Sequence, residues 1–358
     1  MIGSVNAIAS PPGRESAPDA RPSGLLLLLV CLILPNAALG EGSQPTVRGT
    51  VTAGADHQAP DWFKDSFLEI QEDAVEAGAA DKHLMLFFTL HNCPYCSRML
   101  TESFETDPNK SYIQRHFDVV MLNVKGDREV VFNENITVLE KELSEILQVR
   151  GTPAILFLDD ENKPVARVNG YRAPPRFRSV LEYVTSKAYR KTTLTKYMAG
   201  NLTAGTYELR DNRLFKPITD LSSIDGPTVV IFENASCYDC PEFHDRLLAN
   251  AEVLKQLARF TVVRLNTDSA ETIVDGSGNA TTAGALADRY DMSFRPGVLI
   301  FDGGELVRRY DSLVYSFHFT EGLLYIADGH YKHDDYRSYS RRRREALLAA
   351  GIDIDFTE

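Results

Sequence analysis

The stretch LMLFFTLHNCPYCSRML, residues 84–100, decides the fold of this chain. It starts with an unbroken apolar run, Leu84 to Leu90, which is typical of a strand buried on both faces. A Cys-x-x-Cys pair, Cys93 and Cys96, follows at once, and the residues after it continue as a helix. This order predicts that the first cysteine lies where a strand ends and a helix begins.

A helix N-terminus would give this cysteine pair its chemistry. Unpaired backbone N–H groups and the positive end of the helix dipole favour the thiolate, which is the nucleophilic form. Pro94 suits the first helical turn, because its missing N–H has no intrahelical partner there. Cys96 lies three residues after Cys93, within disulfide reach. We therefore expect Cys93 to attack a substrate disulfide and Cys96 to resolve the mixed disulfide.

A Thr-Pro pair, Thr152 and Pro153, precedes the next apolar strand at 154–157. Proline lacks the N–H that a central strand needs, so a special turn with a cis peptide bond explains it best. Such a turn would leave the backbone of Thr152 free to pair with an extended substrate beside Cys93.

The second half of the chain repeats this pattern. The stretch TVVIFENASCYDC, residues 228–240, again runs from an apolar strand into a cysteine pair. Cys93 lies 60 residues before Pro153, and Cys237 lies 59 residues before Pro296. A repeat of this length indicates a duplicated domain.

Periodicity predicts the remaining elements of both halves. In the first half we expect strands at 84–90, 117–124, 154–158 and 165–168, and helices at 62–79, after Cys96, at 137–148 and at 176–187. In the second half we expect strands at 228–232, 260–265, 298–301 and 306–310, and helices after Cys240 through Leu248, at 282–290 and at 317–327. The long loops 125–136 and 266–281 should border the cysteine pairs and shape partner choice, because they follow the carboxyl ends of parallel strands.

This order of elements resembles the thioredoxin superfamily over nearly all of residues 61–329. The resemblance implies an α/β fold of two tandem thioredoxin-like domains, each a central mixed sheet flanked by helices. It assigns attack to Cys93, resolution to Cys96 and a cis peptide bond to Pro153, and it places the second copy's counterparts at Cys237, Cys240 and Pro296. The helical lead-in is similar to that of bacterial periplasmic thioredoxin-related proteins linked to disulfide reduction and sulfur oxidation.

The chain also departs from the family pattern. Asn92 stands where thioredoxin has a tryptophan, and Phe87 replaces the family's buried acidic residue, so a proton relay through that carboxylate is not expected. In the second copy Arg295 stands where threonine is usual, and we expect its guanidinium to lie near Cys237 and to stabilise the thiolate or bind an anionic substrate. The expected substrate-binding residues are Thr152, Pro153, Arg295 and Pro296.

The segments outside the repeat suggest export. Arg14 and Arg21 precede an apolar run at 25–34, and a small-x-small pattern ends at Gly40, which is the layout of a secretory signal peptide. A short membrane anchor is the alternative, although the run is about half of what spans a bilayer. We expect the mature chain to have no stable membrane insertion and to reside in the bacterial periplasm.

The predicted domain boundaries follow from these patterns: a signal peptide at 1–40, a flexible linker at 41–60, a first domain at 61–190, a second domain with its connecting segment at 191–330, and a helical tail at 331–358 that stops near Gly351. The formal net charge of −12 excludes a general nucleic-acid binder. The expected partners are protein thiols and disulfides and an upstream redox partner, with no cofactor beyond the cysteines.

Other interpretations of the cysteines remain open. The 140 residues between the two pairs are far more than a shared zinc site uses. Cys237, Cys240 and His244 could hold a metal, although a surface histidine is the favoured interpretation. Either pair could be a static disulfide, and His91 could tune Cys93 or simply lie in a solvent-exposed loop. The rival function is a binding protein, either a metal carrier or a holdase. Four Asn-x-Ser/Thr triplets are taken as chance occurrences: Asn135, Asn201, Asn234 and Asn279.

Overall fold

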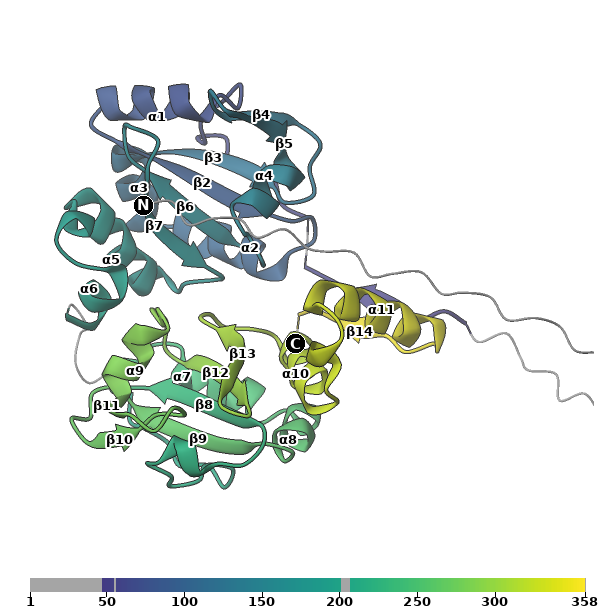
Figure 1. The fold of residues 1–358 in the computed structure, drawn as a ribbon. Coiled ribbons are helices and arrows are strands. Elements are labelled where there is room, and N and C mark those ends of the chain that lie inside the picture. Colours follow the sequence, from purple (N-terminus) through teal and green to yellow (C-terminus); the bar gives the residue numbers. More distant parts are fainter. Residues whose placement is uncertain (1–46, 55, 201–206, 358) are drawn as a thin grey trace, which may run out of the picture. The chain divides into compact units, whose positions relative to one another are not determined.

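The apolar run that opens the sequence forms the central strand of the first sheet (Figure 1). β2 (His83–Thr89) has every residue buried, which requires cover on both faces. It pairs in parallel with β3 (Phe117–Asn123) and antiparallel with β6 (Ala154–Leu158). β7 (Pro164–Asn169) completes the order β3-β2-β6-β7. The predicted mixed sheet is confirmed.

The computed structural model of the protein describes residues 47–54, 56–200 and 207–357. The predicted signal peptide at 1–40 lies outside the described residues, as does part of the predicted linker. Within the described ranges, no helix combines the length and the apolar character needed to cross a membrane.

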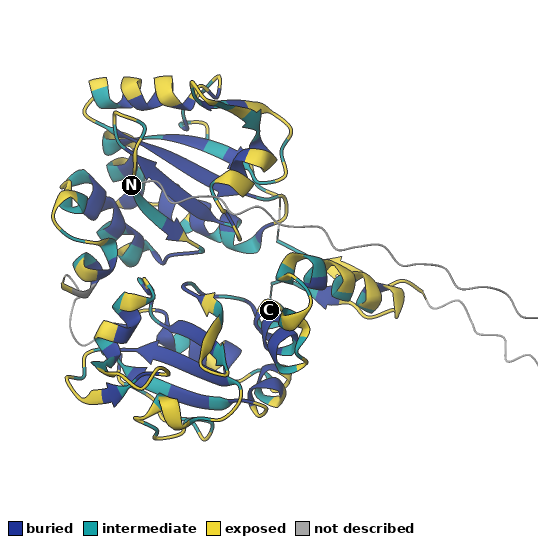
Figure 2. Ribbon diagram, in the orientation of Figure 1, coloured by how far each residue is buried: buried dark blue, intermediate teal, exposed yellow. Residues whose placement is uncertain are grey.

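Alternate side chains of β2 enter two different hydrophobic cores, as the two-residue period of a strand requires. Met85 and Phe87 pack in one core, and Leu84, Leu86 and Phe88 pack in the other. Figure 2 shows the strands of the sheet as mainly buried and the surrounding helices as partly exposed. The helical segments of this domain are α1 (Ile70–Ala79), α2 (Pro94–Met99), the π-helical η1 (Leu100–Phe104), α3 (Asn109–His116), α4 (Glu140–Ile146), α5 (Pro174–Thr185), η2 (Ala188–Arg190) and α6 (Leu194–Gly200).

The second domain has the same sheet topology. β8 (Thr228–Glu233) pairs in parallel with β9 (Thr261–Asn266) and antiparallel with β12 (Gly297–Asp302), and β13 (Glu305–Tyr310) forms the edge. This match confirms the predicted duplication. The helical segments are η3 (Leu221–Ser223), α7 (Cys240–Glu242), the π-helical η4 (Phe243–Leu247), α8 (Ala251–Leu257), α9 (Ala283–Arg289), α10 (Ser316–Ala327), η5 (His330–Lys332) and α11 (Tyr336–Ala349).

Each domain carries a small hairpin where the sequence predicted a long loop. β4 (Glu129–Asn133) pairs with β5 (Ile136–Leu139), and β10 (Thr272–Val274) pairs with β11 (Ala280–Thr282). The predicted helix at 137–148 is therefore wrong at its start. Its first residues have β-branched side chains that fit a strand, and their pairing with β4 decides their conformation.

The predicted helix at 62–79 is also too long, because α1 begins only at Ile70. Leu68 has a φ of 64°, and this left-handed conformation interrupts a right-handed helix. The described part of the predicted linker contains a short strand. β1 (Val51–Thr52) pairs in parallel with β14 (Ile354–Asp355), a partner about 300 residues away that local composition does not reveal.

The helical tail ends as predicted. α11 runs to Ala349, and Gly351 follows with a φ of 76°. Glycine adopts this left-handed conformation at low cost, which is why it commonly ends helices.

Candidate active sites

The first cysteine pair lies at a helix N-terminus, as predicted. Cys93 and Cys96 form a disulfide whose Cα atoms are 5.2 Å apart. Cys93 is the N-cap residue of α2, and Pro94 is the first residue of the helix. Cys93 is 7% exposed, whereas Cys96 is fully buried. The first cysteine of the pair is therefore the one that a substrate can reach.

Two polar donors reach the sulfur of Cys93. The backbone N–H of Cys96 lies 3.2 Å from the Sγ atom, and the hydroxyl of Thr152 lies 3.3 Å from it. Hydrogen bonds to a charged group favour its charged form, so both donors would stabilise a thiolate on Cys93. The Thr152–Pro153 peptide bond is cis, as predicted, and its loop brings Thr152 to the cysteine pair.

A segment that precedes the first domain lies on the motif. The N–H of Gly54 donates to the carbonyl of Asn92 at 3.1 Å. A Cβ atom on Gly54 would lie 2.6 Å from the Cα atom of Pro94, so a larger residue cannot fit there without movement. The segment around Gly54 therefore depends on a glycine for its close approach to the motif.

Histidines near the first pair hold local structure. The ring of His57 bridges the hydroxyl groups of Thr89 and Ser97 through its two nitrogens. His91, a candidate for tuning Cys93, is exposed and pairs with Asp56 at 3.0 Å. Its interpretation as an exposed loop histidine fits this position.

The position where the resemblance to thioredoxins leads one to expect a buried acidic residue holds an apolar side chain. Phe87 is fully buried, and its ring packs edge-on against Phe104 with centroids 5.3 Å apart. The side chain at this position therefore offers no carboxylate to exchange a proton with the cysteines.

The second pair has a different environment. Cys237 and Cys240 also form a disulfide, with Cα atoms 5.4 Å apart, but both residues are 0% exposed. α7 begins at Cys240, so Cys237 lies in the turn before the helix rather than at its N-cap. Tyr207 and Leu209 pack against the two cysteines. The second disulfide is therefore closed to solvent in this structure.

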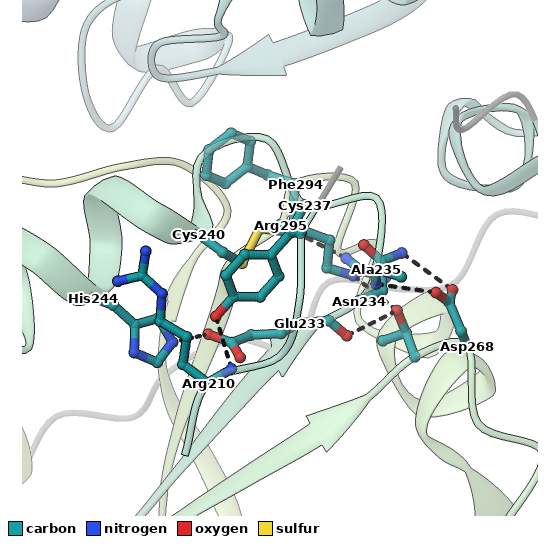
Figure 3. Close-up of a disulfide and its surroundings, with 12 residues drawn as sticks. Arg210, Glu233, Asn234, Ala235, Cys237, Cys240, His244, Asp268, Phe294 and Arg295 are labelled. Carbon is teal, nitrogen blue, oxygen red and sulfur yellow. Dashed lines mark hydrogen bonds and ion pairs between the residues drawn. A yellow bond between two sulfur atoms is a disulfide. The ribbon is translucent and has the colours of Figure 1, made fainter. Parts of the chain in front are cut away.

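Arg295 holds the loop beside the second pair (Figure 3). The Arg295–Pro296 peptide bond is cis, as predicted. The guanidinium donates to the carbonyls of Met292 and Phe294, at 2.8 and 2.9 Å, and to the hydroxyl of Thr267 at 3.2 Å. Burial lowers the pKa of Arg295 to about 10. We expected this group to serve the Cys237 thiolate, but its observed partners are loop oxygens, and a role at the thiolate stays a prediction.

Asp239 is a buried carboxyl inside the second motif. It is 3% exposed, and its Oδ2 atom has no hydrogen-bond partner. Burial raises the pKa of Asp239 to about 7, and the positive charge of Arg172 opposes this rise. The motif therefore contains a group that changes charge near neutral pH.

Sequence reasoning missed a buried contact between a histidine and a glutamate in the second domain. His244 was interpreted as a surface histidine, but it is only 8% exposed, and its Nε2 atom lies 2.7 Å from Oε1 of Glu233. Glu233 is fully buried, and its Oε2 atom has no hydrogen-bond partner. Figure 3 shows the two side chains turned toward each other. The available signal was the position of His244 between the apolar residues Phe243 and Leu247.

The side chains of the alternative metal site, Cys237, Cys240 and His244, are engaged in other contacts. The cysteines are joined to each other, and His244 pairs with Glu233. In the part of the chain that the structure describes, no group of three or more His, Cys, Asp or Glu side chains could hold a metal ion.

The segment after β9 borders the second motif, as predicted. The N–H of Thr267 donates to the carbonyl of Glu233 at 2.9 Å. The carboxylate of Asp268 accepts from the N–H of Ala235 and from the side-chain amide of Asn234, both at 3.2 Å. These contacts fix the residues that lead into Cys237.

The chain is similar to several known proteins. Residues 70–185 match the family model of a thioredoxin-like domain. A thioredoxin-fold protein from Helicobacter pylori is 28% identical, with 32% of this chain and 74% of that chain covered and a TM-score of 0.29. A thioredoxin from Thermus thermophilus is 24% identical, with coverages of 33% and 85% and a TM-score of 0.27. A disulphide isomerase from Xylella fastidiosa is 21% identical, with coverages of 38% and 96% and a TM-score of 0.24. No curated protein matches the chain.

Proposed function

Since the chain carries a thioredoxin-like domain at residues 70–185 and a second domain of the same topology, each with a Cys-x-x-Cys pair, we propose that it is an exported thiol–disulfide oxidoreductase. It exchanges dithiols and disulfides with proteins or small thiols. The first domain holds the working centre, with Cys93 as the attacking cysteine and Cys96 as the resolving one.

One observation carries the proposal. The sulfur of Cys93 lies at the N-cap of α2 and receives hydrogen bonds from the N–H of Cys96 and the hydroxyl of Thr152. The helix dipole and both donors act in the same direction, toward a thiolate at neutral pH. Such a sulfur is a nucleophile in the reduced protein and a good leaving group in the oxidised one.

The exchange proceeds in two steps. In the reduced protein the Cys93 thiolate attacks one substrate sulfur, the substrate disulfide breaks, and the other substrate sulfur leaves as a thiolate. The Cys96 thiolate then attacks the sulfur of Cys93, which releases the second substrate thiolate and forms the disulfide seen here. A dithiol partner upstream must reduce this disulfide before the next turnover. In reverse, the same steps oxidise a substrate dithiol.

The test is insulin reduction with dithiothreitol as electron source. Cys93→Ser should abolish activity, and Cys96→Ser should accumulate a mixed disulfide through Cys93. Cys237→Ser should retain most of the activity if the first centre does the work. Activity that survives Cys93→Ser and Cys237→Ser together would exclude the oxidoreductase function. Circular dichroism of each variant controls for folding.

A second function is favoured for the second domain by the burial of its disulfide. With Cys237 and Cys240 both 0% exposed, this domain could bind partners while its cysteines stay oxidised. In that case Cys237→Ser would leave insulin reduction unchanged and weaken the binding of a partner protein. Loss of insulin reduction in Cys237→Ser would instead make the second centre part of the catalytic cycle.

The proposed export, to the bacterial periplasm, rests on the sequence of residues 1–40. Arg14 and Arg21 precede the apolar run, and small residues follow it. Residues 1–45 fused to an alkaline phosphatase that lacks its own signal should yield active enzyme, because this enzyme needs disulfides that form outside the cytoplasm. Fusions that stay in the cytoplasm and inactive would contradict export.

A further inference from the structure

We propose that Tyr207 sets the specificity of the second centre: its ring closes the Cys237–Cys240 disulfide to small thiols, and only a partner that displaces residues 207–211 can exchange with it. This inference rests on the proposed function and adds a restriction on which partners can exchange with the second disulfide. It begins from the difference in burial between the two disulfides.

The two centres differ in accessibility although their domains share one topology. Cys93 keeps 7% of its surface exposed, whereas neither Cys237 nor Cys240 has any. The side chains that cluster with the second pair are Tyr207 and Leu209, and Tyr207 itself is 7% exposed. The aromatic ring is therefore one of the side chains that pack against the buried disulfide.

Thiol–disulfide exchange needs access to a sulfur atom. An incoming thiolate must approach Cys237 so that its sulfur forms a bond as the bond between Cys237 and Cys240 breaks. The electron pair of that bond goes to Cys240, which leaves as a thiolate. A sulfur that is fully covered offers no such approach, so the covering residues have to move first.

Residues 207–211 are held by a few hydrogen bonds and by ion pairs, and the guanidinium of Arg264 donates to the carbonyl of Arg210 at 2.9 Å. The N–H of Tyr207 donates to the carbonyl of Ala235 at 2.9 Å, and the N–H of Arg210 donates to the Tyr207 hydroxyl at 3.3 Å. The guanidinium of Arg210 pairs with Asp245, but both side chains are largely exposed. Exposed ion pairs contribute little to stability, so these contacts favour the closed state without locking it.

The position of the cover favours displacement by a protein partner. Ala235, which accepts the hydrogen bond from Tyr207, lies two residues before Cys237 and is also fixed by Asp268 (Figure 3). An extended segment that bound beside Cys237 could compete for these groups and shift residues 207–211 away. A small thiol makes too few contacts to drive such a shift, because a ligand changes a population only through its differential affinity for the two states.

The test measures the reduction of each disulfide alone by dithiothreitol. A Cys93→Ser/Cys96→Ser chain retains only the second disulfide, and a Cys237→Ser/Cys240→Ser chain retains only the first. Alkylation followed by mass spectrometry gives the rate of thiol formation. The second disulfide should react more slowly than the first by about tenfold or more, because only its open fraction reacts.

In the chain that retains only the second disulfide, Tyr207→Ala should increase the rate of reduction by dithiothreitol about tenfold or more over the parent chain. Tyr207→Phe keeps the ring and loses only the hydroxyl, so it should react within about twofold of the parent chain. Equal rates for the two disulfides, an unchanged rate in Tyr207→Ala, or equal acceleration in Tyr207→Phe would each overturn the inference. Circular dichroism and hydrogen exchange of β8 confirm that the variants are folded.

This experiment is separable from the test of the proposed function. Insulin reduction could fail while Tyr207→Ala still opens the second disulfide to dithiothreitol, and then only the proposed function is lost. Conversely, insulin reduction could succeed while dithiothreitol reduces the two disulfides at equal rates. Then only the proposed role of Tyr207 is lost.

Discussion

Asp239 gives the second domain a pH-dependent stability that can be calculated from its position. Burial raises the pKa of this carboxyl to about 7 from its ordinary value of 3.8. Each pKa unit corresponds to about 1.4 kcal/mol, so ionising Asp239 in the folded state costs roughly 4 kcal/mol in full. A raised pKa means that the folded domain holds the proton more tightly. The contribution of Asp239 to stability is therefore fully present below pH 3.8 and is lost as the pH rises through 7.

Asp239→Asn removes this titration and keeps the shape of the side chain. Between pH 5 and pH 8 the oxidised parent protein should lose roughly 3 kcal/mol of unfolding free energy that the variant keeps. The two proteins are compared by the change in unfolding free energy between pH 5 and pH 8. The amide donor that the substitution adds shifts the variant's free energy equally at both pH values, so it does not affect this change. Urea unfolding followed by circular dichroism measures both domains, and fluorescence of Trp62, the single tryptophan, monitors the first domain separately. Equal pH dependence in the two proteins would refute the reasoning.

Three further substitutions test the first centre and the second core. Thr152→Val removes a hydrogen bond to Cys93 and should raise the thiol pKa by about one unit, measured by thiolate absorbance; an unchanged pKa would remove Thr152 from the site. His244→Ala leaves the buried Glu233 side chain without its histidine partner and should lower the free energy of unfolding in urea by about 3–5 kcal/mol. A loss below about 1 kcal/mol would mean that water replaces the imidazole. Gly54→Ala should move the segment around Gly54 away from the motif and raise the alkylation rate of Cys93 in the reduced protein. An unchanged rate would show that the neighbouring backbone shifts instead.

The fold could be predicted from the sequence wherever apolar runs and cysteine spacing acted together. The strand at 154–158 lies where it was predicted, and β2 differs by one residue at each end. Both runs are buried on both faces, so their apolar character reflects their position directly. The helix predicted from Trp62 was too long, because local spacing does not reveal the left-handed backbone at Leu68.

The candidate sites were predictable in their cysteines and prolines but not in their surroundings. Cys93, Thr152 and Pro153 came together because a strand end, a helix start and a turn fix them. The cover of Tyr207 over the second pair depends on a contact between residues 30 apart, with no local pattern to mark it. The partners of Arg295 are mainly backbone oxygens, which are present at every residue, so spacing could not select them.

The parallel pairing of β1 with β14 closes the described chain into a loop. The N–H of Ile354 donates to the carbonyl of Thr50, and the N–H of Phe356 donates to that of Thr52, both at 2.9 Å. A pull on the two ends of parallel strands loads them in shear, so these bonds share the force. Gly54 follows β1 by two residues and lies on the first cysteine motif. The pairing of β1 with β14 thus connects the C-terminal tail to the segment that lies against the backbone of the first cysteine motif.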